Sequence, residues 1–441
     1  MKAIRPNPSA GIGDLAGTNG SPEPLRILIF GINYAPEVTG IGPYTTELAE
    51  HLAEHGHEVE VVTGMPHYPE WRRMPVPQNT TVSPRVHRHW HYVPKRAGAF
   101  GRMLYELSWF LTAAPDAIRK HPDLVIGVVP SLSGGLLAVL AGRRNRACVG
   151  LIAQDLMGPA AAQSGYDGGR RVAGLTGLVE RFVLRRCKGV AVVSDGFRDH
   201  LNRAGISSSR IHSVRNWTHP GEPTESIPEC RRRLGWGPTD FICLHAGNMG
   251  KKQGLDNVLD AAALLKSSHI RFVLSGGGND RGRLVDRASR MRLDNVSFLG
   301  LQEGGKYQAM LRAADVLLLN QRATVGDMAL PSKLASYFAA GRPVAAAVAL
   351  RSPAASELER SAGGIIVPAE CPQALAKAIL DLSLAPDRRA VLGSLARKYA
   401  EDQLTAESAL RSYDQFVEQL VIGRRNSARS RAEKQGAGGL G

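Results

Sequence analysis

The sequence predicts an α/β protein in which two doubly wound, Rossmann-like domains face a central cleft. Short segments rich in Val, Ile and Leu alternate with longer segments of helical periodicity, the pattern of βαβ units with parallel sheets. The alternation occurs in two series, which are separated by a stretch rich in proline and glycine. With 441 residues, the chain is long enough for two such domains, each with its own core.

The composition supports a folded enzyme. Apolar residues make up 43% of the chain and charged residues 22%, with 48 glycines, which suits an α/β enzyme better than a disordered, collagen-like or coiled-coil chain. Lys and Arg number 55 against 40 Asp and Glu, and the net charge of +15 favours phosphate-bearing partners: nucleic acid, anionic lipid or phosphorylated substrates. Five scattered cysteines without a Cys-x-x-Cys pair favour a reducing cytosol and indicate neither a disulfide framework nor a zinc site.

The first series of predicted strands lies within residues 25–218, which we assign to an N-terminal Rossmann-like domain. Residues 1–24 are rich in Pro, Gly, Ser and Asn and lack an apolar core, so we expect a disordered leader instead of a signal peptide. The uncharged stretch 124–142 approaches the length of a membrane span, about 20 residues. Pro130 and Gly134 interrupt it, so we interpret it as a buried strand, a turn and a helix start. The predicted strands are RILIFG, EVEVVT, LVIGVV, CVGLIA and VAVVS.

The second series follows a linker that we place at residues 219–237, where prolines and glycines favour irregular backbone. It gives a C-terminal Rossmann-like domain over residues 238–404. Apolar spacing predicts an amphipathic helix over 405–422. Residues 423–441 are basic and end in glycines, so we expect a disordered tail, with a membrane or polyanion tether as the alternative. The predicted strands of this domain are FICLHAG, RFVLSG, VSFLG, DVLLLN and PVAAAV.

A glycine-containing loop follows the first predicted strand. Gly40 and Gly42 directly precede a helix that can begin at Pro43, and such an entrance brings backbone N–H groups and the helix dipole close to an anion. A plain turn with a proline start is the alternative. A nicotinamide site is disfavoured because the Gly-x-Gly-x-x-Thr run lacks the third glycine and lies well beyond the strand.

Two loops of the second domain carry further candidates for anion binding. Asn248, Lys251 and Lys252 follow the strand FICLHA, and two lysines beside exposed backbone can neutralise a diphosphate. Gly277 and Gly278 follow the next strand and permit the close approach of a base or ribose. The alternatives are solvent-exposed lysines and an ordinary turn.

The segment 327–341 has the features of an anion clamp. Pro331 is placed to start a helix that ends near Gly341, and the free N–H groups of Ser332, Lys333 and Leu334 are then expected to point into the cleft. An ordinary amphipathic helix is the alternative. The chain contains no Asp-x-Asp pair, so a divalent-metal diphosphate site is not indicated.

These motifs together resemble glycosyltransferase family 4, and within it the transferases of colanic acid and exopolysaccharide assembly. The resemblance rests on YAPE, TGIG and the following Tyr44, on GHEV, on the GN-GK-QGL loop and on LPSKL with AAGRPV, and it covers residues 25–420. It implies the GT-B fold, a retaining hexosyltransferase activity, an acceptor bound by the first domain, and a C-terminal helix that returns to that domain.

The resemblance also implies a donor site for a nucleotide-diphospho-sugar in the second domain, with neither cofactor nor metal. In the first domain it assigns the loop near the diphosphate and acceptor to Gly40, Ile41 and Gly42. The donor-binding residues that we carry over are Gly247, Asn248, Lys251, Lys252, Gly277, Gly278, Leu330, Ser332, Lys333, Leu334 and Ser336.

The sequence departs from the family pattern at several positions. The family often has two glutamates separated by seven residues. Ser336 stands at the second position, and Asp327 lies one place before the first. The usual Arg and Lys of the diphosphate loop fall at Asn248 and Gln253, so Lys251 or Lys252 must substitute. A histidine common before the IAQDL acid is replaced here, which leaves Asp155 as the candidate.

The catalytic candidates are Asp155, Asp327 and Lys333. Cleavage of the anomeric bond requires a stabilised nucleotide diphosphate, which amide dipoles and Lys333 can supply in a closed cleft. Asp155 can orient the acceptor or accept its proton, or can simply cap backbone. Asp327 can hydrogen-bond sugar hydroxyls, with a surface turn as the alternative.

Residues 94–120 form a possible contact with a membrane. The segment MLYELSWFLTAAP combines aliphatic and aromatic residues with basic flanks, as in a helix at a bilayer interface, and a core helix is the alternative. His87, His89 and His91 alternate along one strand face, but a fourth ligand is missing and metal binding is not favoured.

We therefore predict a cytoplasmic glycosyltransferase that transfers a sugar from a UDP- or GDP-sugar to a carbohydrate acceptor, in its more specific form a lipid-linked one, in exopolysaccharide synthesis. Peripheral attachment to the inner face of the cytoplasmic membrane follows if the acceptor is lipid-linked. The alternatives are a sugar-nucleotide epimerase or phosphorylase of the same fold, and a basic nucleic-acid-binding protein. The last is disfavoured because the basic residues are spread over both halves without a nucleic-acid-binding motif.

Overall fold

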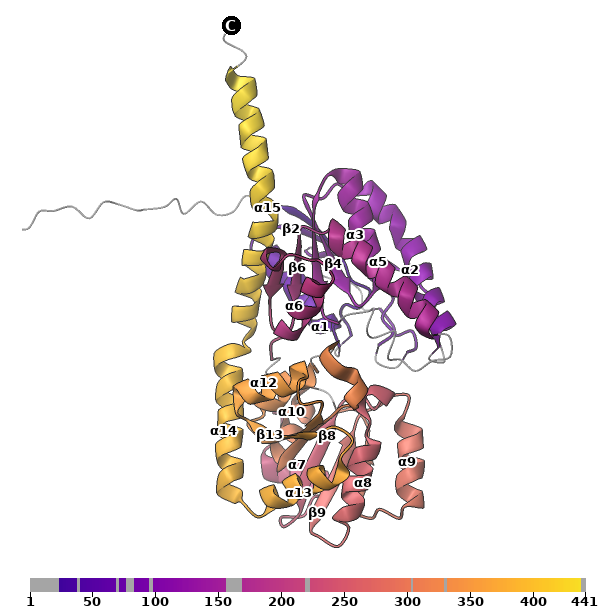
Figure 1. Ribbon diagram of the computed structural model, residues 1–441, viewed down its shortest axis with the longest axis vertical. Helices are drawn as coiled ribbons and strands as arrows, with labels where there is room; N and C mark the ends of the chain where they lie inside the picture. The colour runs from indigo at the N-terminus through magenta and orange to yellow at the C-terminus, as the bar shows by residue number, and fades with distance from the viewer. Residues whose placement is uncertain are drawn as a thin grey trace, which may run out of the picture.

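The protein consists of two α/β domains stacked one above the other, with a long C-terminal helix along one side (Figure 1). The structure is a computed structural model. It describes residues 24–37, 40–68, 71–76, 83–94, 98–155, 169–218, 223–302, 304–328 and 331–437. The predicted leader therefore lies almost entirely outside the described residues.

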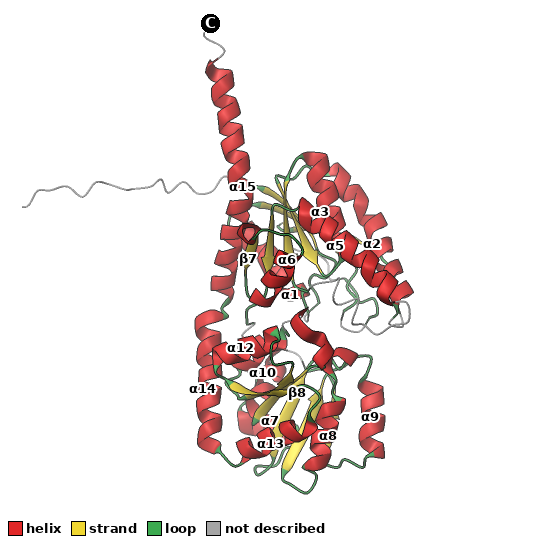
Figure 2. Cartoon of the chain, viewed as in Figure 1, coloured by secondary structure: helices red, strands yellow, loops and turns green. Residues whose placement is uncertain are grey.

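The first domain contains a parallel seven-stranded sheet in the order β3-β2-β1-β4-β5-β6-β7, with helices on both faces (Figure 2). Its central strands are buried along nearly their whole length, as expected for a parallel sheet covered on both sides. The strands are β1 (Arg26–Phe30), β2 (Glu58–Gly64), β3 (Arg85–His89), β4 (Leu124–Val129), β5 (Cys148–Ala153), β6 (Gly189–Val192) and β7 (Ile211–Ser213). The helices are α1 (Gly42–Glu54), α2 (Ala99–Arg119), α3 (Leu132–Asn145), α5 (Gly169–Arg186), α6 (Asp195–Arg203) and η1 (Ser208–Arg210).

The second domain contains a parallel six-stranded sheet in the order β10-β9-β8-β11-β12-β13. Its strands are β8 (Phe241–Ala246), β9 (Ile270–Ser275), β10 (Val296–Leu299), β11 (Val316–Asn320), β12 (Val344–Val348) and β13 (Gly364–Pro368). Its helices are α7 (Ile227–Arg233), η2 (Lys251–Gln253), α8 (Asp256–Leu264), α9 (Arg281–Arg290), α10 (Gly304–Ala313), η3 (Ala323–Met328), α11 (Lys333–Ala339), α12 (Pro353–Ser361), α13 (Pro372–Ser383) and α14 (Pro386–Gln403). The predicted fold class, two doubly wound domains, is confirmed.

The chain returns to the first domain through its last helix, α15 (Ala406–Ala437). At the crossing, the Thr218 N–H donates to the Leu404 carbonyl at 2.9 Å. Phe416 and Leu420 of α15 then pack on the first sheet over Gly150 of β5 and Gly189 of β6. A Cβ at Gly150 would lie only 2.6 Å from Leu420 Cδ1, so the missing side chains in these strands make room for the helix.

Two elements differ from the sequence prediction. The helix α15 continues to Ala437, past the predicted end at residue 422 and through much of the predicted disordered tail; Ala, Arg, Lys and Glu are strong helix formers, and no proline stops them. The predicted linker 219–237 contains α7, whose start is fixed by a capping box between Ser226 and Glu229. Cys230 of α7 is buried in the second domain's core.

The stretch tested as a membrane span forms the strand β4, a turn and the helix α3, as predicted. In the part of the chain that the structure describes, none of the helices has both the length and the hydropathy required to cross a bilayer.

The packing of α15 predicts a measurable loss of stability for Phe416→Ala. Phe416 is fully buried between α15 and the first sheet, and removal of a buried Phe side chain costs about 3–5 kcal/mol. The free energy of unfolding of the first domain should therefore fall by about that amount in chemical denaturation. Leu384→Ala, at a side chain that is 73% exposed, is the control and should change it by less than about 0.5 kcal/mol. Equal effects of the two changes would contradict this account of the crossing.

Candidate active site

The candidate site lies where the carboxyl ends of the strands of both sheets face each other, which is where open α/β sheets bind ligands. Asp155 directly follows β5 of the first domain, and Lys252 lies in the loop after β8 of the second. Their side chains form an ion pair across the cleft, with Lys252 Nζ 3.8 Å from Asp155 Oδ2. The cleft therefore brings together two candidate residues that are 97 positions apart in the sequence.

Two glycine loops of the second domain are pressed against each other beside this ion pair. Gly247 has a φ of +128° and Gly276 a φ of +133°, and a Cβ at Gly276 would lie 2.0 Å from the Gly247 carbonyl oxygen. The Met249 N–H donates to the Gly277 carbonyl at 2.7 Å. Gly278 has a φ of +139° and no room for a Cβ beside Met249, whereas a Cβ at Gly277 would point into open space. The loop after β9 thus supports the loop after β8, and side chains are excluded where the two loops meet.

Lys333 is held over Gly247 by the anchoring of α11. The Tyr337 hydroxyl accepts a hydrogen bond from the Ala246 N–H at 2.9 Å and donates to the Ala246 carbonyl at 3.2 Å. Lys333 and Tyr337 are four residues apart and share one face of the helix. The amine and Cε of Lys333 accordingly lie 3.4 Å from the position of a Cβ on Gly247. A larger residue at position 247 would contact the amine directly.

The surroundings of Lys333 favour its neutral form. Burial lowers the pKa of Lys333 to about 7. Its Nζ lies 3.4 Å from Nε2 of His245, a fully buried side chain at the end of β8. Burial, together with the adjacent Lys333 cation, holds the pKa of His245 well below its usual range. The charged form of Lys333 would therefore be favoured by an anion bound beside it.

The backbone that carries Lys251 and Lys252 is fixed by buried Asn320. The side-chain amide of Asn320 donates to the carbonyls of Gln253 and Gly254 at 2.6 and 2.9 Å. The Arg322 N–H also donates to the Lys252 carbonyl at 3.0 Å. The two lysine side chains are exposed, so a fixed turn presents two positive charges at the surface beside the cleft.

The first domain contributes the segments 31–37 and 40–42, whose contacts are organised by Glu37. The Glu37 carboxylate is 3% exposed and accepts hydrogen bonds from the backbone N–H groups of His67 and Tyr68, at 2.8 and 3.0 Å. Gly40 has a φ of +71°, and a Cβ there would lie 3.0 Å from the Tyr68 ring. A Cβ at Gly42 would lie 3.0 Å from the Glu37 carbonyl oxygen. The Gly-x-Gly spacing is thus required for the loop to close against its neighbours.

A buried histidine completes this loop. His67 is 1% exposed, and its Nε2 lies 3.1 Å from the Tyr105 hydroxyl while its Nδ1 lies 3.0 Å from the Met65 carbonyl oxygen. Burial lowers the pKa of His67 to about 4, so its ring is neutral at physiological pH. A neutral ring with Nδ1 protonated donates to the Met65 carbonyl and accepts the Tyr105 proton, which ties α2 to the loop.

Comparison with known proteins shows the family to which the chain belongs. Residues 39–217 match the family described as "Glycosyl transferase 4-like domain", and residues 226–399 match "Glycosyl transferases group 1". The chain is 32% identical over 410 residues to the putative colanic acid biosynthesis glycosyl transferase WcaI of Escherichia coli strain K12, covering 88% of this chain and 98% of that relative. The chain belongs to the glycosyltransferases of the GT-B fold. The resemblance seen in the sequence motifs is confirmed.

Solved structures place the glycosyltransferase in the same fold. Sucrose-phosphate synthase from Thermosynechococcus elongatus superimposes with a TM-score of 0.72 at 20% identity, covering 90% of this chain and all of that one. Anabaena HepE in complex with UDP-glucose gives a TM-score of 0.65 at 16% identity, covering 90% of this chain and 99% of that one. At these identities the likeness shows the fold.

Several predicted site residues are placed differently from the expectation. The helix α11 has only seven residues and begins at Lys333, not at Pro331. Ser332, which precedes it, has helical backbone angles but makes no capping hydrogen bond through its side chain. The Leu334 N–H is not free, since it donates to the Pro331 carbonyl at 3.0 Å. Ser332 lines a small cavity together with Asn216 and Leu404, next to the crossing between the two domains. This geometry leaves the Lys333 side chain, more than the helix start, as the group aimed at the cleft.

Three other candidates are placed as follows. The hydroxyl of Ser336 is hydrogen-bonded to the phenol of Tyr307, which is partly buried, so it contributes to the packing of α11. Asp327 lies in η3, and its side chain is outside the described part of the structure. Leu330 also lies outside the described residues.

Sequence reasoning missed His245, Asn320, Tyr337 and Glu37 of this glycosyltransferase. His245 and Asn320 stand at the ends of apolar strands, where a polar residue in a buried run was an available signal. Glu37 was part of the YAPE motif but received no role. Tyr337 gave no such signal, because a tyrosine four residues after a lysine is common in amphipathic helices.

The low pKa of Lys333 predicts a pH-dependent gain in stability on substitution by methionine. The ordinary lysine pKa is 10.5, so between about pH 7 and 10 the unfolded chain binds a proton that the native protein does not, and native stability rises with pH. At pH 6.5 the native protein must keep a charged amine in a buried position, which lowers its stability. Lys333→Met removes this cost and should raise the free energy of unfolding by about 1–2 kcal/mol at pH 6.5 and by less at pH 9.

Chemical denaturation at the two pH values measures this difference. Lys266→Met is the control, because the Lys266 side chain is exposed and distant from the cleft. A Lys333→Met effect that is the same at both pH values would show that Lys333 is protonated throughout.

Proposed function

We propose that the protein transfers a hexose from a UDP- or GDP-sugar to a carbohydrate acceptor carried on a lipid, with retention of the anomeric configuration, in cell-surface polysaccharide synthesis. The observation that carries the proposal is the Lys333 amine held at Gly247, in a cleft whose other wall presents Asp155. UDP is our preferred donor nucleotide, because HepE, which has a similar fold, was solved in complex with UDP-glucose. The relationship to a putative colanic acid transferase supports the exopolysaccharide context.

The donor diphosphate fits the groups at the end of β8. Gly247 has no side chain that would keep phosphate oxygens away from its backbone. Lys333 beside it supplies a cation whose charge is little stabilised by water, because the amine is buried. Lys252 and Lys251 can follow the diphosphate as it enters, since their side chains are exposed. Up to three lysine charges then more than neutralise the two negative charges of the diphosphate without a metal ion.

The chemistry follows from this charge balance. The bond between the anomeric carbon and the β-phosphate oxygen breaks, and the electron pair remains on the departing nucleoside diphosphate beside Lys333. The acceptor oxygen forms the new bond to the anomeric carbon. Its proton passes to Asp155 or to the leaving phosphate oxygen, both of which lie within the same cleft in this arrangement. Binding of the diphosphate draws Lys252 away from Asp155 and so makes that carboxylate available.

An exposed apolar stripe on α2 supports a membrane-bound acceptor. Tyr105 and Trp109 point into the core and are almost fully buried, but the opposite face of the same helix is apolar as well. In Figure 1 α2 lies on the outer side of the first domain. Exposed on this face are Phe100 (68%), Met103 (52%), Leu107 (48%), Leu111 (62%) and Ile118 (47%).

Aromatic and basic residues border the stripe. Trp90 and Tyr92 are exposed and adjoin α2, since the Thr112 hydroxyl donates to the Trp90 carbonyl and the Tyr92 N–H donates to the Ser108 hydroxyl. Arg119 is exposed at the end of the helix. The core-helix alternative for residues 94–120 therefore describes one face of α2. The other face has the exposed apolar side chains that we expect of a helix in contact with an anionic phospholipid surface.

Direct binding measurements test the donor site. UDP-glucose should bind to the full chain in calorimetry, and Lys333→Ala should weaken binding at pH 6.5 by about 10- to 100-fold, the cost of a lost hydrogen bond to a charged group. Because the charged form of Lys333 binds the diphosphate, affinity should also fall as pH rises above about 7, up to about tenfold per unit. Lys333→Ala should lose this pH dependence.

Lys266→Ala, distant from the cleft, is the matched control and should bind as the wild type does. The proposal fails if no UDP- or GDP-sugar binds, or if Lys333→Ala leaves the affinity unchanged. A salt-sensitive complex with DNA in the absence of sugar-nucleotide binding would instead support the nucleic-acid alternative.

The fate of the sugar distinguishes the enzyme classes. With a bound donor and a lipid-linked oligosaccharide acceptor, we expect a product whose new glycosidic bond has the same anomeric configuration as the donor. NMR of the new anomeric proton measures this configuration. Asp155→Asn should reduce turnover by about 10²- to 10⁴-fold if the carboxylate accepts the proton, with donor affinity preserved. Turnover of the sugar nucleotide that needs no acceptor would support an epimerase, and release of a sugar phosphate would support a phosphorylase.

Vesicle co-sedimentation tests the α2 stripe. The double substitution Leu107→Asp and Leu111→Asp should abolish binding of the full chain to vesicles that contain phosphatidylglycerol, because it places two charges on the interfacial face. The control is Leu350→Asp with Leu384→Asp, two leucines of the second domain that are also exposed and give the same change in charge. Equal losses in both variants, or no binding by the wild type, would contradict a membrane role for α2.

A further inference from the structure

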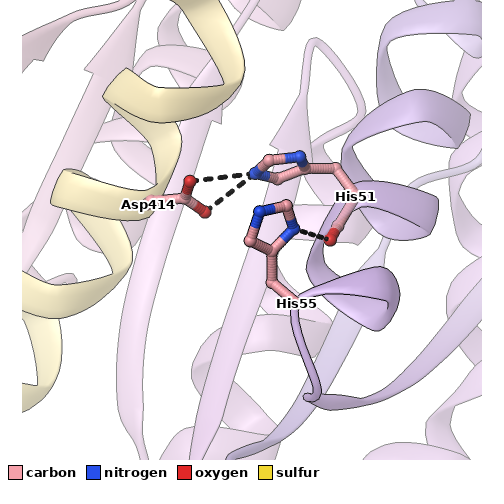
Figure 3. Close-up of side chains that lie close together, drawn as sticks. All are labelled: His51, His55 and Asp414. Atoms are coloured by element: carbon pink, nitrogen blue, oxygen red, sulfur yellow. Dashed lines mark hydrogen bonds and ion pairs between the residues drawn. The ribbon is translucent and has the colours of Figure 1, made fainter. Parts of the chain in front are cut away.

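Two histidines and an aspartate meet on the first domain, away from the residues proposed for sugar transfer. His51 and His55 lie one turn apart near the end of α1, and Asp414 faces them from α15 (Figure 3). Nε2 of His51 lies 2.9 Å from both carboxylate oxygens of Asp414. One ligand atom from each of the three residues lies within 4.8 Å of the other two.

The tautomer of His55 is fixed by the backbone. Nδ1 of His55 lies 2.8 Å from the His51 carbonyl oxygen, which can only accept a hydrogen bond, so Nδ1 carries the proton. Nε2 of a neutral His55 is then an unprotonated donor of an electron pair, and Figure 3 shows it on the side of Asp414. Metal-binding histidines typically have this arrangement, with the second ring nitrogen hydrogen-bonded to a backbone carbonyl.

The separations suit a small transition-metal ion. Bonds of about 2.0–2.2 Å in a tetrahedral zinc site place neighbouring ligand atoms about 3.3–3.5 Å apart. The observed separations, from 2.9 Å to no more than 4.8 Å, lie on both sides of this value. The His55 side chain is exposed, so a small adjustment of its ring that keeps the Nδ1 hydrogen bond can shorten the longer separations without movement of the helices.

We propose that His51, His55 and Asp414 bind one Zn²⁺ ion, with a water molecule as fourth ligand, and that the ion fastens α15 to α1. Two imidazoles and a carboxylate are a donor set that zinc uses in proteins, and the residue spacing of four places both imidazoles on one helix face. The ion replaces the hydrogen bond between His51 and Asp414.

The consequence is a clip on the element that joins the domains. The helix α15 follows the crossing at Leu404, and α1 begins at Gly42 in the cleft, so the ion links the two. Since the site needs both helices in place, the native state binds the ion more tightly than the unfolded chain and is stabilised by it.

Titration of the metal-free full chain with Zn²⁺ tests the proposal. Calorimetry should show one ion per chain, and Co²⁺ in its place should give the visible absorption of a tetrahedral site. Loss of even an outer-shell partner weakens metal sites about 10- to 100-fold, so His55→Ala and Asp414→Asn should each weaken zinc binding at least about tenfold. The control is His121→Ala, an exposed histidine of the same domain outside the cluster, which should leave the affinity unchanged.

Hydrogen exchange separates a clip from an incidental zinc contact. Zn²⁺ should slow exchange in residues 406–422 of the wild type and leave it unchanged in His55→Ala, whose fold circular dichroism can verify. The proposal is overturned if zinc does not bind with one-to-one stoichiometry, if either variant binds as tightly as the wild type, or if exchange in α15 does not respond to the ion. None of these readouts depends on sugar transfer.

Discussion

The geometry of the cleft depends on the return of the chain from the second domain to the first. The crossing is fixed by the backbone hydrogen bond between Thr218 and Leu404. On one side of it, α14 packs closely on the second domain, where a Cβ at Gly393 would lie 2.4 Å from the Gly341 carbonyl oxygen. On the other side, Phe416 of α15 fills the space over the first sheet. The two helices thereby set how the facing loops meet.

Within the cleft, the features on which the proposed donor site depends are ones that cost stability. Glycines with positive φ at Gly247, Gly276 and Gly278 allow two loops to touch, and the touching loops leave backbone exposed where a phosphate can approach. Burial of Lys333 next to His245 makes its charged form expensive in the free protein. Residues with perturbed pKa values in clefts are typical of functional sites, and here the perturbation has a geometric cause, the anchoring of α11 by Tyr337.

The first domain uses buried polar groups for a different purpose. The hydrogen bonds of Glu37 and His67 go to the backbone of residues 65–68 and to the Tyr105 hydroxyl, and these contacts position the segment around Gly40 and Gly42. The helix α1 begins at this segment and ends at Glu54. Near this end, His51 contacts Asp414 of α15. One helix therefore connects the cleft with the C-terminal helix. The helix α2, on the opposite side of the domain, combines a core face with an exposed apolar one.

The sequence by itself determined the fold class, both sheets and most strands, because parallel strands buried on both faces read as continuous apolar runs between helical segments. It also indicated the glycine loops and Lys333, since glycine and lysine at strand ends are visible in one dimension. It did not determine α7 or the length of α15, where prolines and basic residues suggested irregular backbone although a capping box and strong helix formers were present.

Only the tertiary structure decided which side chains meet. Three contacts join residues that are 88, 97 and 363 positions apart in the sequence: Lys333 with His245, Asp155 with Lys252, and Asp414 with His51. Their approach depends on sheet order and on the path of α15, which no local pattern encodes. For the same reason the low pKa of Lys333 could not be predicted, because it arises from burial by residues that are neighbours only after folding.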